Sequence, residues 1–141
     1  MELSEYLVAM VEKQASDLFI SVGAPPMVNV EGRMSALDNN VVDEESARAL
    51  LHSVLNDEQR KTFQNDLELN MALQVPNAGR FRMNLFYQRG APAAVCRHIK
   101  DQIPSVSQLG LPTKLHDIIM GERGLVLVVG GTGTGKSTTL A

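Results

Sequence analysis

A run of glycines and hydroxyl side chains with one lysine carries the clearest chemistry in this sequence. Residues 130–137 read G-G-T-G-T-G-K-S, which fits the phosphate-loop pattern G-x-x-x-x-G-K-S. Glycines let a backbone turn its N–H groups toward an anion, and the helix that follows directs its positive end at the same point. The pattern predicts a nucleotide site whose cofactor-binding residues are Gly130, Gly131, Thr132, Gly133, Thr134, Gly135, Lys136, Ser137 and Thr138.

Two side chains of this loop have separate predicted roles. Lys136 is expected to reach the β- and γ-phosphates, and the hydroxyl of Ser137 is expected to ligate Mg²⁺. An apolar run over residues 125–129 precedes the loop and predicts the buried strand that leads into such a site. The alternative is a glycine-rich turn with no ligand, and the apolar run before the loop favours nucleotide binding over it.

Composition and charge limit the other partners of the chain. It has 141 residues, of which 44% are hydrophobic and 21% charged, and its net charge is −3. This is the composition of a globular chain, and its acidic balance disfavours a nucleic-acid partner. No apolar run reaches transmembrane length, so direct membrane insertion is not expected. The single cysteine, Cys96, cannot form an intrachain disulfide, which favours the cytoplasm.

The elements before the loop predict an α+β domain. Capping residues predict three helices, which begin at Ser4, Asp43 and Asn56. Gln59, three residues after Asn56, completes a predicted capping box. Apolar residues that alternate predict six strands, over residues 18–22, 27–30, 33–37, 67–75, 81–87 and 93–99. Short turns join the last three, so we expect one antiparallel sheet of five or six strands with two or three helices against it.

The remainder of the chain leads from this domain to the phosphate loop. Residues 100–110 hold Pro104 and several polar side chains and are predicted to form a linker. Pro112 is expected in the first turn of a further helix. Only four residues follow Ser137, so the acidic Walker B strand is not within the chain. We therefore expect a nucleotide domain truncated after Walker A, and a chain that by itself does not hydrolyse ATP.

Six short segments of the chain resemble one family. They read A-S-D-L-F-I, G-A-P-P, R-F-R-M-N, A-A-V-C-R, L-G-L-P and R-G-L-V-L-V, at residues 15–20, 23–26, 80–84, 93–97, 109–112 and 123–128. Together they make the whole chain similar to the type IV pilus retraction ATPases, the PilT/PilU family. The resemblance implies a PAS-like N-terminal domain over 1–99, a linker over 100–111, and the first edge of a RecA-like α/β P-loop domain over 112–141.

The resemblance also implies a function. Members of this family are hexameric motor ATPases that use ATP and Mg²⁺ to drive pilus retraction and twitching motility. The implied location is cytoplasmic, peripheral to the inner-membrane pilus machine. The implied partners are further copies in a homo-hexamer, the inner-membrane platform protein of the pilus and a related retraction ATPase. One alternative is a pilus-assembly or type II secretion ATPase of the same superfamily. An alternative of another class is a PAS-type sensory or regulatory module, which would need an enclosed apolar pocket within residues 1–99.

The family pattern assigns catalytic roles to two arginines beside Lys136. Taken from the residues alone, Arg82 and Arg97 are best interpreted as solvated strand arginines. The resemblance reverses this interpretation, because family arginines at these positions reach the nucleotide phosphates, where a guanidinium stabilises developing charge. Asp17 is predicted to bond a neighbouring turn. Phe19, Gly131 and the segment at 86–89 depart from the PilT pattern toward that of PilU.

Overall fold

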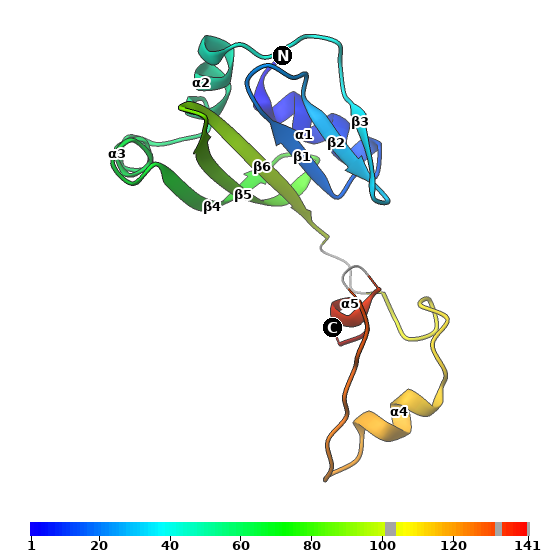
Figure 1. The fold of residues 1–141 in the computed structure, drawn as a ribbon. Helices are drawn as coiled ribbons and strands as arrows, with labels where there is room; N and C mark the ends of the chain where they lie inside the picture. Colours follow the sequence, from blue (N-terminus) through cyan, green and yellow to red (C-terminus); the bar gives the residue numbers. More distant parts are fainter. Residues whose placement is uncertain (101–103, 132–133, 141) are drawn as a thin grey trace. The chain divides into compact units, whose positions relative to one another are not determined.

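The chain divides into two compact units, Met1–Lys100 and Asp101–Ala141. A computed structural model describes residues 1–100, 104–131 and 134–140. Thr132 and Gly133 of the predicted nucleotide site, and residues 101–103 of the predicted linker, lie outside the described residues. Figure 1 shows the course of the chain through each unit.

A six-stranded antiparallel sheet is the frame of the first unit, in the order β3-β2-β1-β6-β5-β4. Its strands are β1 (Asp17–Ile20), β2 (Met27–Val30), β3 (Arg33–Ala36), β4 (Glu68–Val75), β5 (Gly79–Gln88) and β6 (Ala91–Ile99). The first three strands pair in sequence order, and so do the last three. Antiparallel pairing of β1 with β6 joins the two sets (Figure 1). The predicted α+β class with an antiparallel sheet is confirmed.

Two hairpin turns follow directly from their local sequences. At residues 31–32 and 89–90 both turn positions have positive φ, namely 50° and 83° for Glu31 and Gly32, and 54° and 81° for Arg89 and Gly90. A two-residue turn with two left-handed positions is a type I′ turn, whose twist matches that of the flanking strands. Glycine at the second position adopts this conformation without a Cβ clash. These turns set the registers of β2 with β3 and of β5 with β6.

The first unit also holds three helices, α1 (Leu3–Glu12), α2 (Glu44–His52) and α3 (Asp57–Asp66). The predicted cap of α1 at Ser4 is wrong, because the helix begins one residue earlier, at Leu3. The Glu5 carboxylate accepts a hydrogen bond of 2.7 Å from the Glu2 backbone N–H. This bond makes Glu2 the cap and leaves Ser4 inside the first turn.

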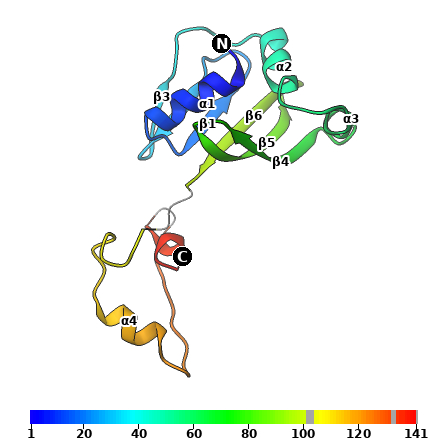
Figure 2. The ribbon, with the colours of Figure 1, turned by 180° about the vertical axis from the view of Figure 1, so that it is seen from behind.

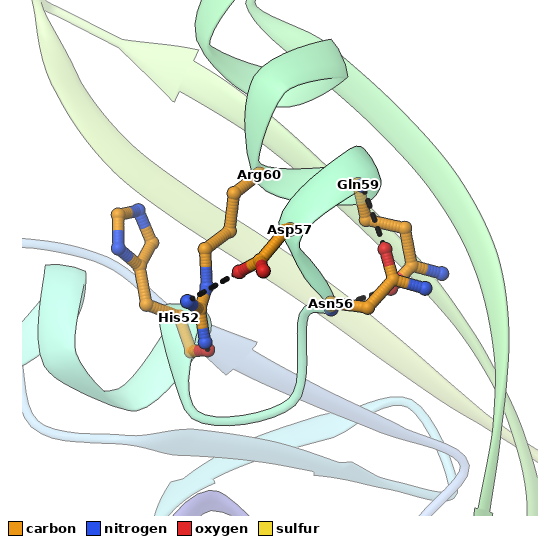
Figure 3. Close-up of polar contacts among 5 residues, drawn as sticks. All are labelled: His52, Asn56, Asp57, Gln59 and Arg60. Carbon is orange, nitrogen blue, oxygen red and sulfur yellow. Dashed lines mark hydrogen bonds and ion pairs between the residues drawn. The ribbon is translucent and has the colours of Figure 1, made fainter.

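The caps of α2 and α3 are formed as predicted. Asp43 Oδ1 accepts a hydrogen bond of 2.7 Å from the Ser46 backbone N–H at the start of α2. Asn56 and Gln59 exchange side-chain-to-backbone hydrogen bonds of 2.9 and 3.0 Å, which is the predicted capping box (Figure 3). In the same view Arg60 pairs with Asp57 at 3.2 Å. Arg60 Nη2 also donates a hydrogen bond of 3.2 Å to the His52 carbonyl, which ties α3 to the end of α2.

The helices supply the apolar layer over one face of the sheet. In Figure 1 helix α1 lies behind the sheet, and in Figure 2, seen from behind, it lies in front. The fully buried core includes Leu3, Leu7 and Met10 from α1, Leu51, Phe63, Leu18, Ile20, Phe81, Met83, Leu85 and Cys96. Side chains alternate along a strand, so the residues between these core positions lie on the opposite face, which we call the open face. Arg82 and Arg97 are exposed and belong to the open face.

The described residues of the second unit form two short helices, α4 (Lys114–Ile119) and α5 (Lys136–Leu140). The strand predicted over residues 125–129 is wrong for this chain, since these residues have no strand structure and Leu125 is 82% exposed. A strand requires a hydrogen-bonded neighbour, and the described part of the unit contains no other strand. Among the described residues, no helix is long and apolar enough to span a membrane.

The capping box of α3 provides a test of these local contacts. We expect Asn56→Ala to lower the free energy of unfolding by about 1 kcal/mol, because the Gln59 N–H loses its acceptor. Urea unfolding of the 141-residue chain, followed by circular dichroism, measures this change. Gln64→Ala, an exposed position in the same helix, is the control and should leave the midpoint nearly unchanged. Equal midpoints for Asn56→Ala and the wild type would contradict the assigned cap.

Candidate functional site

The phosphate loop has backbone requirements that explain two of its glycines. Gly135 has a φ of 91°, which is a left-handed conformation that side chains with a Cβ rarely adopt. A Cβ built on Gly130 would lie 2.7 Å from Thr134 Oγ1, which is too close for a real contact. Thr134 Oγ1 in turn donates a hydrogen bond of 2.8 Å to the Gly131 carbonyl. The loop is therefore folded on itself through the side chain of Thr134.

Lys136 and Ser137 open the helix after the loop. The Lys136 ammonium donates a hydrogen bond to the Gly131 carbonyl, so this cation lies against the backbone of the loop. Ser137 and Thr138 are exposed, and with Gly135 and Lys136 they line a hollow of about 220 Å³. One ammonium and two hydroxyl groups around a hollow are a donor set that suits phosphate oxygens and a phosphate-bound cation. The described part of the loop thus fits the nucleotide predicted for it.

The second predicted group, the arginine pair, lies in the first unit. Arg82 on β5 and Arg97 on β6 are direct cross-strand partners in the sheet register. Like charges placed directly opposite each other are destabilising in an antiparallel sheet. Both arginines are exposed on the open face, so their guanidinium groups are accessible to an anion from solvent. The two arginines to which the family pattern assigns the same role therefore lie side by side in the sheet.

A third residue completes a row across the open face. Asp17 on β1 is the partner of Arg97 on the other side, so the row runs Asp17, Arg97, Arg82 across β1, β6 and β5. Arg97 Nε donates a hydrogen bond of 2.7 Å to Asp17 Oδ1. Ser16 Oγ donates a second, also of 2.7 Å, to Asp17 Oδ2. The local sequence around Asp17 predicts a bond to a neighbouring turn and gives no sign of the contact with Arg97, which comes from a strand 80 residues away.

The two members of this ion pair differ in exposure. The Asp17 side chain is 8% exposed, whereas that of Arg97 is 70% exposed. Burial by itself would raise the pKa of Asp17, but the hydrogen bonds from Ser16 and Arg97, together with the positive charge of Arg97, hold it below its ordinary value of 3.8. Asp17 is therefore ionised at neutral pH and offsets one of the two positive charges beside it.

Other groups with possible chemistry are explained by packing. Cys96 is fully buried in the core, and burial raises the pKa of its thiol to about 12, which makes it a poor nucleophile. The ring of His98 lies against Phe81 with centroids 5.2 Å apart. Within the described ranges, no group of three or more histidine, cysteine or acidic side chains could hold a metal ion. Two candidate sites therefore remain. One is the phosphate loop, and the other is the row of Asp17, Arg97 and Arg82, which we call the arginine row.

Known proteins match the chain over most or all of its length. It is 43% identical over all 141 residues to the type IV pilus ATPase PilU of Pseudomonas aeruginosa, and 38% identical to the retraction ATPase PilT of the same organism. It is also 41% identical over 116 residues to a twitching motility protein of Neisseria gonorrhoeae. Over the region that it spans, the chain belongs to the PilT/PilU family. The resemblance inferred from its short segments is confirmed.

The matches to PilU and PilT include the whole of this chain but less than half of either relative. The chain covers 37% of the PilU protein and 41% of the PilT protein, so it spans about two fifths of the relatives that it matches. No protein-family model matches it. Its identity to PilU exceeds that to PilT, in the same direction as the departures at Phe19 and Gly131.

Solved structures of two ATPases share this fold. The structure of the pilus retraction motor PilT with bound ADP matches 99% of the chain with a TM-score of 0.80 at 35% identity, and 41% of that chain is covered. The ATPase DotB of Legionella pneumophila also gives a TM-score of 0.80, at 26% identity and with 39% of it covered. The backbone of the chain is therefore close to that of known ATPases over the part that they share.

The Asp17–Arg97 pair predicts a pH dependence of stability. A carboxyl whose pKa is lower in the folded than in the unfolded state stabilises the fold above its unfolded pKa, and this contribution is lost as the pH falls through the folded value. We therefore expect the wild type to lose more stability than Asp17→Asn between roughly pH 5 and pH 2. At pH 7 the variant should be less stable by about 1 kcal/mol, because Arg97 is largely exposed.

Urea unfolding of the 141-residue chain at a series of pH values measures both quantities. Arg97→Gln removes the other partner and should flatten the acid limb in the same way. Arg33→Gln, an exposed arginine on the edge strand β3, is the matched control and should keep the wild-type slope. Parallel acid limbs for the wild type and Asp17→Asn would show that the pair does not contribute to stability.

Proposed function

We propose that the chain is the N-terminal part of a hexameric motor ATPase that drives type IV pilus retraction, and so twitching motility, by hydrolysing ATP. The observation that carries this proposal is the match over all 141 residues to PilU and PilT, both named as type IV pilus ATPases. The phosphate loop supplies the chemistry that such a motor needs. The full protein, and not this chain alone, is the unit that turns over ATP in the proposal.

The proposed domain organisation has three parts. Residues 1–99 form a PAS-like domain, 100–111 a linker, and 112–141 the start of a RecA-like domain. The division of the chain near Lys100 supports the first boundary. The exposed apolar run at 125–129 supports the third part, because a segment of this kind needs neighbouring strands to bury it.

The proposed cofactors are ATP and Mg²⁺. ATP would be held by residues 130–138, with Lys136 at the β- and γ-phosphates and Ser137 on the metal. The hydrogen bond from the Lys136 ammonium to the Gly131 carbonyl supports this role, since a bound phosphate offers that ammonium a charged acceptor in place of a neutral one. The ADP in the PilT structure supports an adenine nucleotide as the ligand.

Arg82 and Arg97 are proposed to reach the nucleotide phosphates when the PAS-like and RecA-like domains close on each other. A cross-strand pair of cations on an exposed face supports an anionic ligand, because the sheet gains nothing from placing two like charges side by side. Guanidinium groups stabilise charge that develops on a transferred phosphoryl group. Closure would then couple hydrolysis to movement of the subunits.

The proposed surroundings follow from the family. The protein would act in the cytoplasm as a homo-hexamer, peripheral to the inner-membrane pilus machine. Its partners would be the inner-membrane platform protein and a related retraction ATPase. A pilus-assembly or type II secretion ATPase is the second candidate. The similarity to DotB supports it, because DotB is an ATPase that is not named as a pilus retraction motor and yet has the same fold over this region.

A sensory module is a weaker candidate. Such a module needs an enclosed apolar pocket, whereas the hollow of about 410 Å³ in the first unit opens between α1, residues 40–42 and α2. Its lining includes Met1 and Val41, which are 67% and 64% exposed. An open hollow of this kind does not provide the enclosure that ligand sensing within the domain requires.

Substitution of the loop lysine tests the ATPase proposal. In the complete protein we expect Lys136→Ala to abolish ATP hydrolysis, because the phosphates lose their principal cation. Phosphate release under steady-state conditions measures the rate. Lys114→Ala is the matched control, since Lys114 is likewise the first residue of a short helix and is exposed. Turnover by Lys136→Ala at the wild-type rate would refute the assigned role.

Substitution of the arginines tests the clamp across the two domains. We expect Arg97→Ala to lower kcat of the complete protein by up to about a thousandfold, and Arg82→Ala to lower it in the same direction. Arg82→Ala should not lower the stability of the 141-residue chain, because it removes a like-charge neighbour of Arg97. Arg33→Ala on β3 is the control for both measurements. If turnover survives both substitutions, the arginines are surface charges and the clamp is wrong.

A further inference from the structure

Asp17 is an unusual residue on the open face. Among the described residues it is the one charged residue that is buried, with 6% of the whole residue exposed, although the arginines in the same row are exposed. Its carboxylate accepts hydrogen bonds from Ser16 Oγ and Arg97 Nε at 2.7 Å each, and a longer one of 3.5 Å from Asn29 Nδ2. These donors come from β2, β6 and the residue before β1, so the carboxylate is fixed from three sides.

The nitrogen through which Arg97 binds Asp17 determines which of its other donors stay available. The hydrogen bond uses Nε, which lies on the stem side of the guanidinium group, and the terminal nitrogens Nη1 and Nη2 make no hydrogen bond within the described part of the chain. With 70% of the side chain exposed, these nitrogens remain available to a ligand. A guanidinium held by its Nε presents its other donors in a fixed direction, since the group is planar.

The negative charge of Asp17 also reduces the repulsion between the two arginines. Arg97 stands between Asp17 and Arg82 in the row, with a direct cross-strand partner on each side. The carboxylate attracts the guanidinium toward β1 and offsets its repulsion from Arg82. Two cations can therefore remain side by side before an anion arrives, which a sheet without the carboxylate would disfavour.

We propose that Asp17 is a positioning residue, which holds Arg97 by its Nε so that Nη1 and Nη2 face a phosphate group beside Arg82. This rests on the proposed function, in which Arg97 contacts the nucleotide phosphates. Positioning lowers the entropy lost when Arg97 engages the anion, because the side chain is already ordered. Asp17 itself does not touch the phosphate, since two anions would repel.

A double-mutant cycle in the complete protein tests this role. Asp17→Asn keeps an acceptor oxygen and loses the charge, and we expect kcat to fall about tenfold, with up to a hundredfold for Asp17→Ala, since misplacement of a reacting group costs this much. In an Arg97→Ala background, Asp17→Asn should cause no further loss, because it acts through a side chain that is gone. A full additional loss there would show that Asp17 acts on the fold and would overturn the proposal.

Asp38→Asn is the matched control. Asp38 also accepts a side-chain hydrogen bond, from Tyr6 Oη at 2.7 Å, and this bond, with further hydrogen bonds from Asn40, holds its pKa below the ordinary value although burial acts in the opposite direction. It lies outside the arginine row, so its substitution should leave kcat at the wild-type value. If Asp17→Ala does not fold, Asp17→Asn carries the test, because it preserves the shape and an acceptor.

A readout that does not depend on activity separates the two levels of the proposal. In the ¹⁵N spectrum of the 141-residue chain, the Arg97 Nε–Hε signal should be shifted and slow to exchange, and Asp17→Ala should return it to the position of an exposed arginine. A free Arg97 signal in the wild type would overturn positioning. A held signal together with wild-type turnover by Arg97→Ala would refute the phosphate role of Arg97, and with it the proposed function of the pair. Reduced turnover by Arg97→Ala with normal turnover by Asp17→Ala would refute positioning alone.

Discussion

The pairing of β1 with β6 is the contact on which the rest of the first unit depends. It joins two sets of strands that are each local in sequence, and it pairs Asp17 with Arg97 across 80 residues of chain. In the same register Leu18 lies opposite Cys96 and Ile20 opposite Ala94, all of them buried. Because side chains alternate along a strand, a slip of one residue would move the core residues to the open face and the ion pair into the core. One register thus serves both the packing and the candidate site.

One face of the sheet stabilises the fold, and the other carries the charged candidate site. The covered face is filled by apolar side chains from three helices, which supply the driving force for folding. The open face carries the row of Asp17, Arg97 and Arg82, whose net charge is positive and whose donors face solvent. Stability comes from the first face, so the second can hold a pair of like charges at small cost, with the buried carboxylate of Asp17 reducing that cost further.

The phosphate loop obeys a different constraint, which is satisfied within a few residues. Its closest contacts join Thr134 and Lys136 to the Gly131 carbonyl, and Gly135 provides the left-handed turn into α5. The apolar residues before the loop, in contrast, cannot be buried by contacts within a few residues of chain. Leu125, Leu127 and Val129 are 82%, 73% and 84% exposed, because a strand can be buried only by neighbouring strands and helices. A loop can therefore take its shape while the strand before it does not.

Much of the local structure could be predicted from the sequence, since its causes lie within a few consecutive residues. The capping box of Asn56 and Gln59 and the turns at Gly32 and Gly90 are of this kind. The G-x-x-x-x-G-K-S pattern and the similarity to retraction ATPases were likewise evident from residue types and spacing. The cap at Ser4 was mispredicted because Glu5 competes for the end of the same helix, a choice made by side-chain geometry.

Tertiary structure decided which distant residues meet. The local turn at Arg89 and Gly90 sets the register that pairs Arg82 with Arg97, but nothing in the local sequences shows that Asp17 holds Arg97 from the other side. The reason is physical. Caps, turns and phosphate loops are stabilised by backbone preferences and contacts within a few residues, whereas the pairing of β1 with β6 depends on burial of the whole core at once. The sequence by itself determined the local elements and the nucleotide-binding pattern, and only the assembled sheet placed a buried carboxylate beside two exposed arginines.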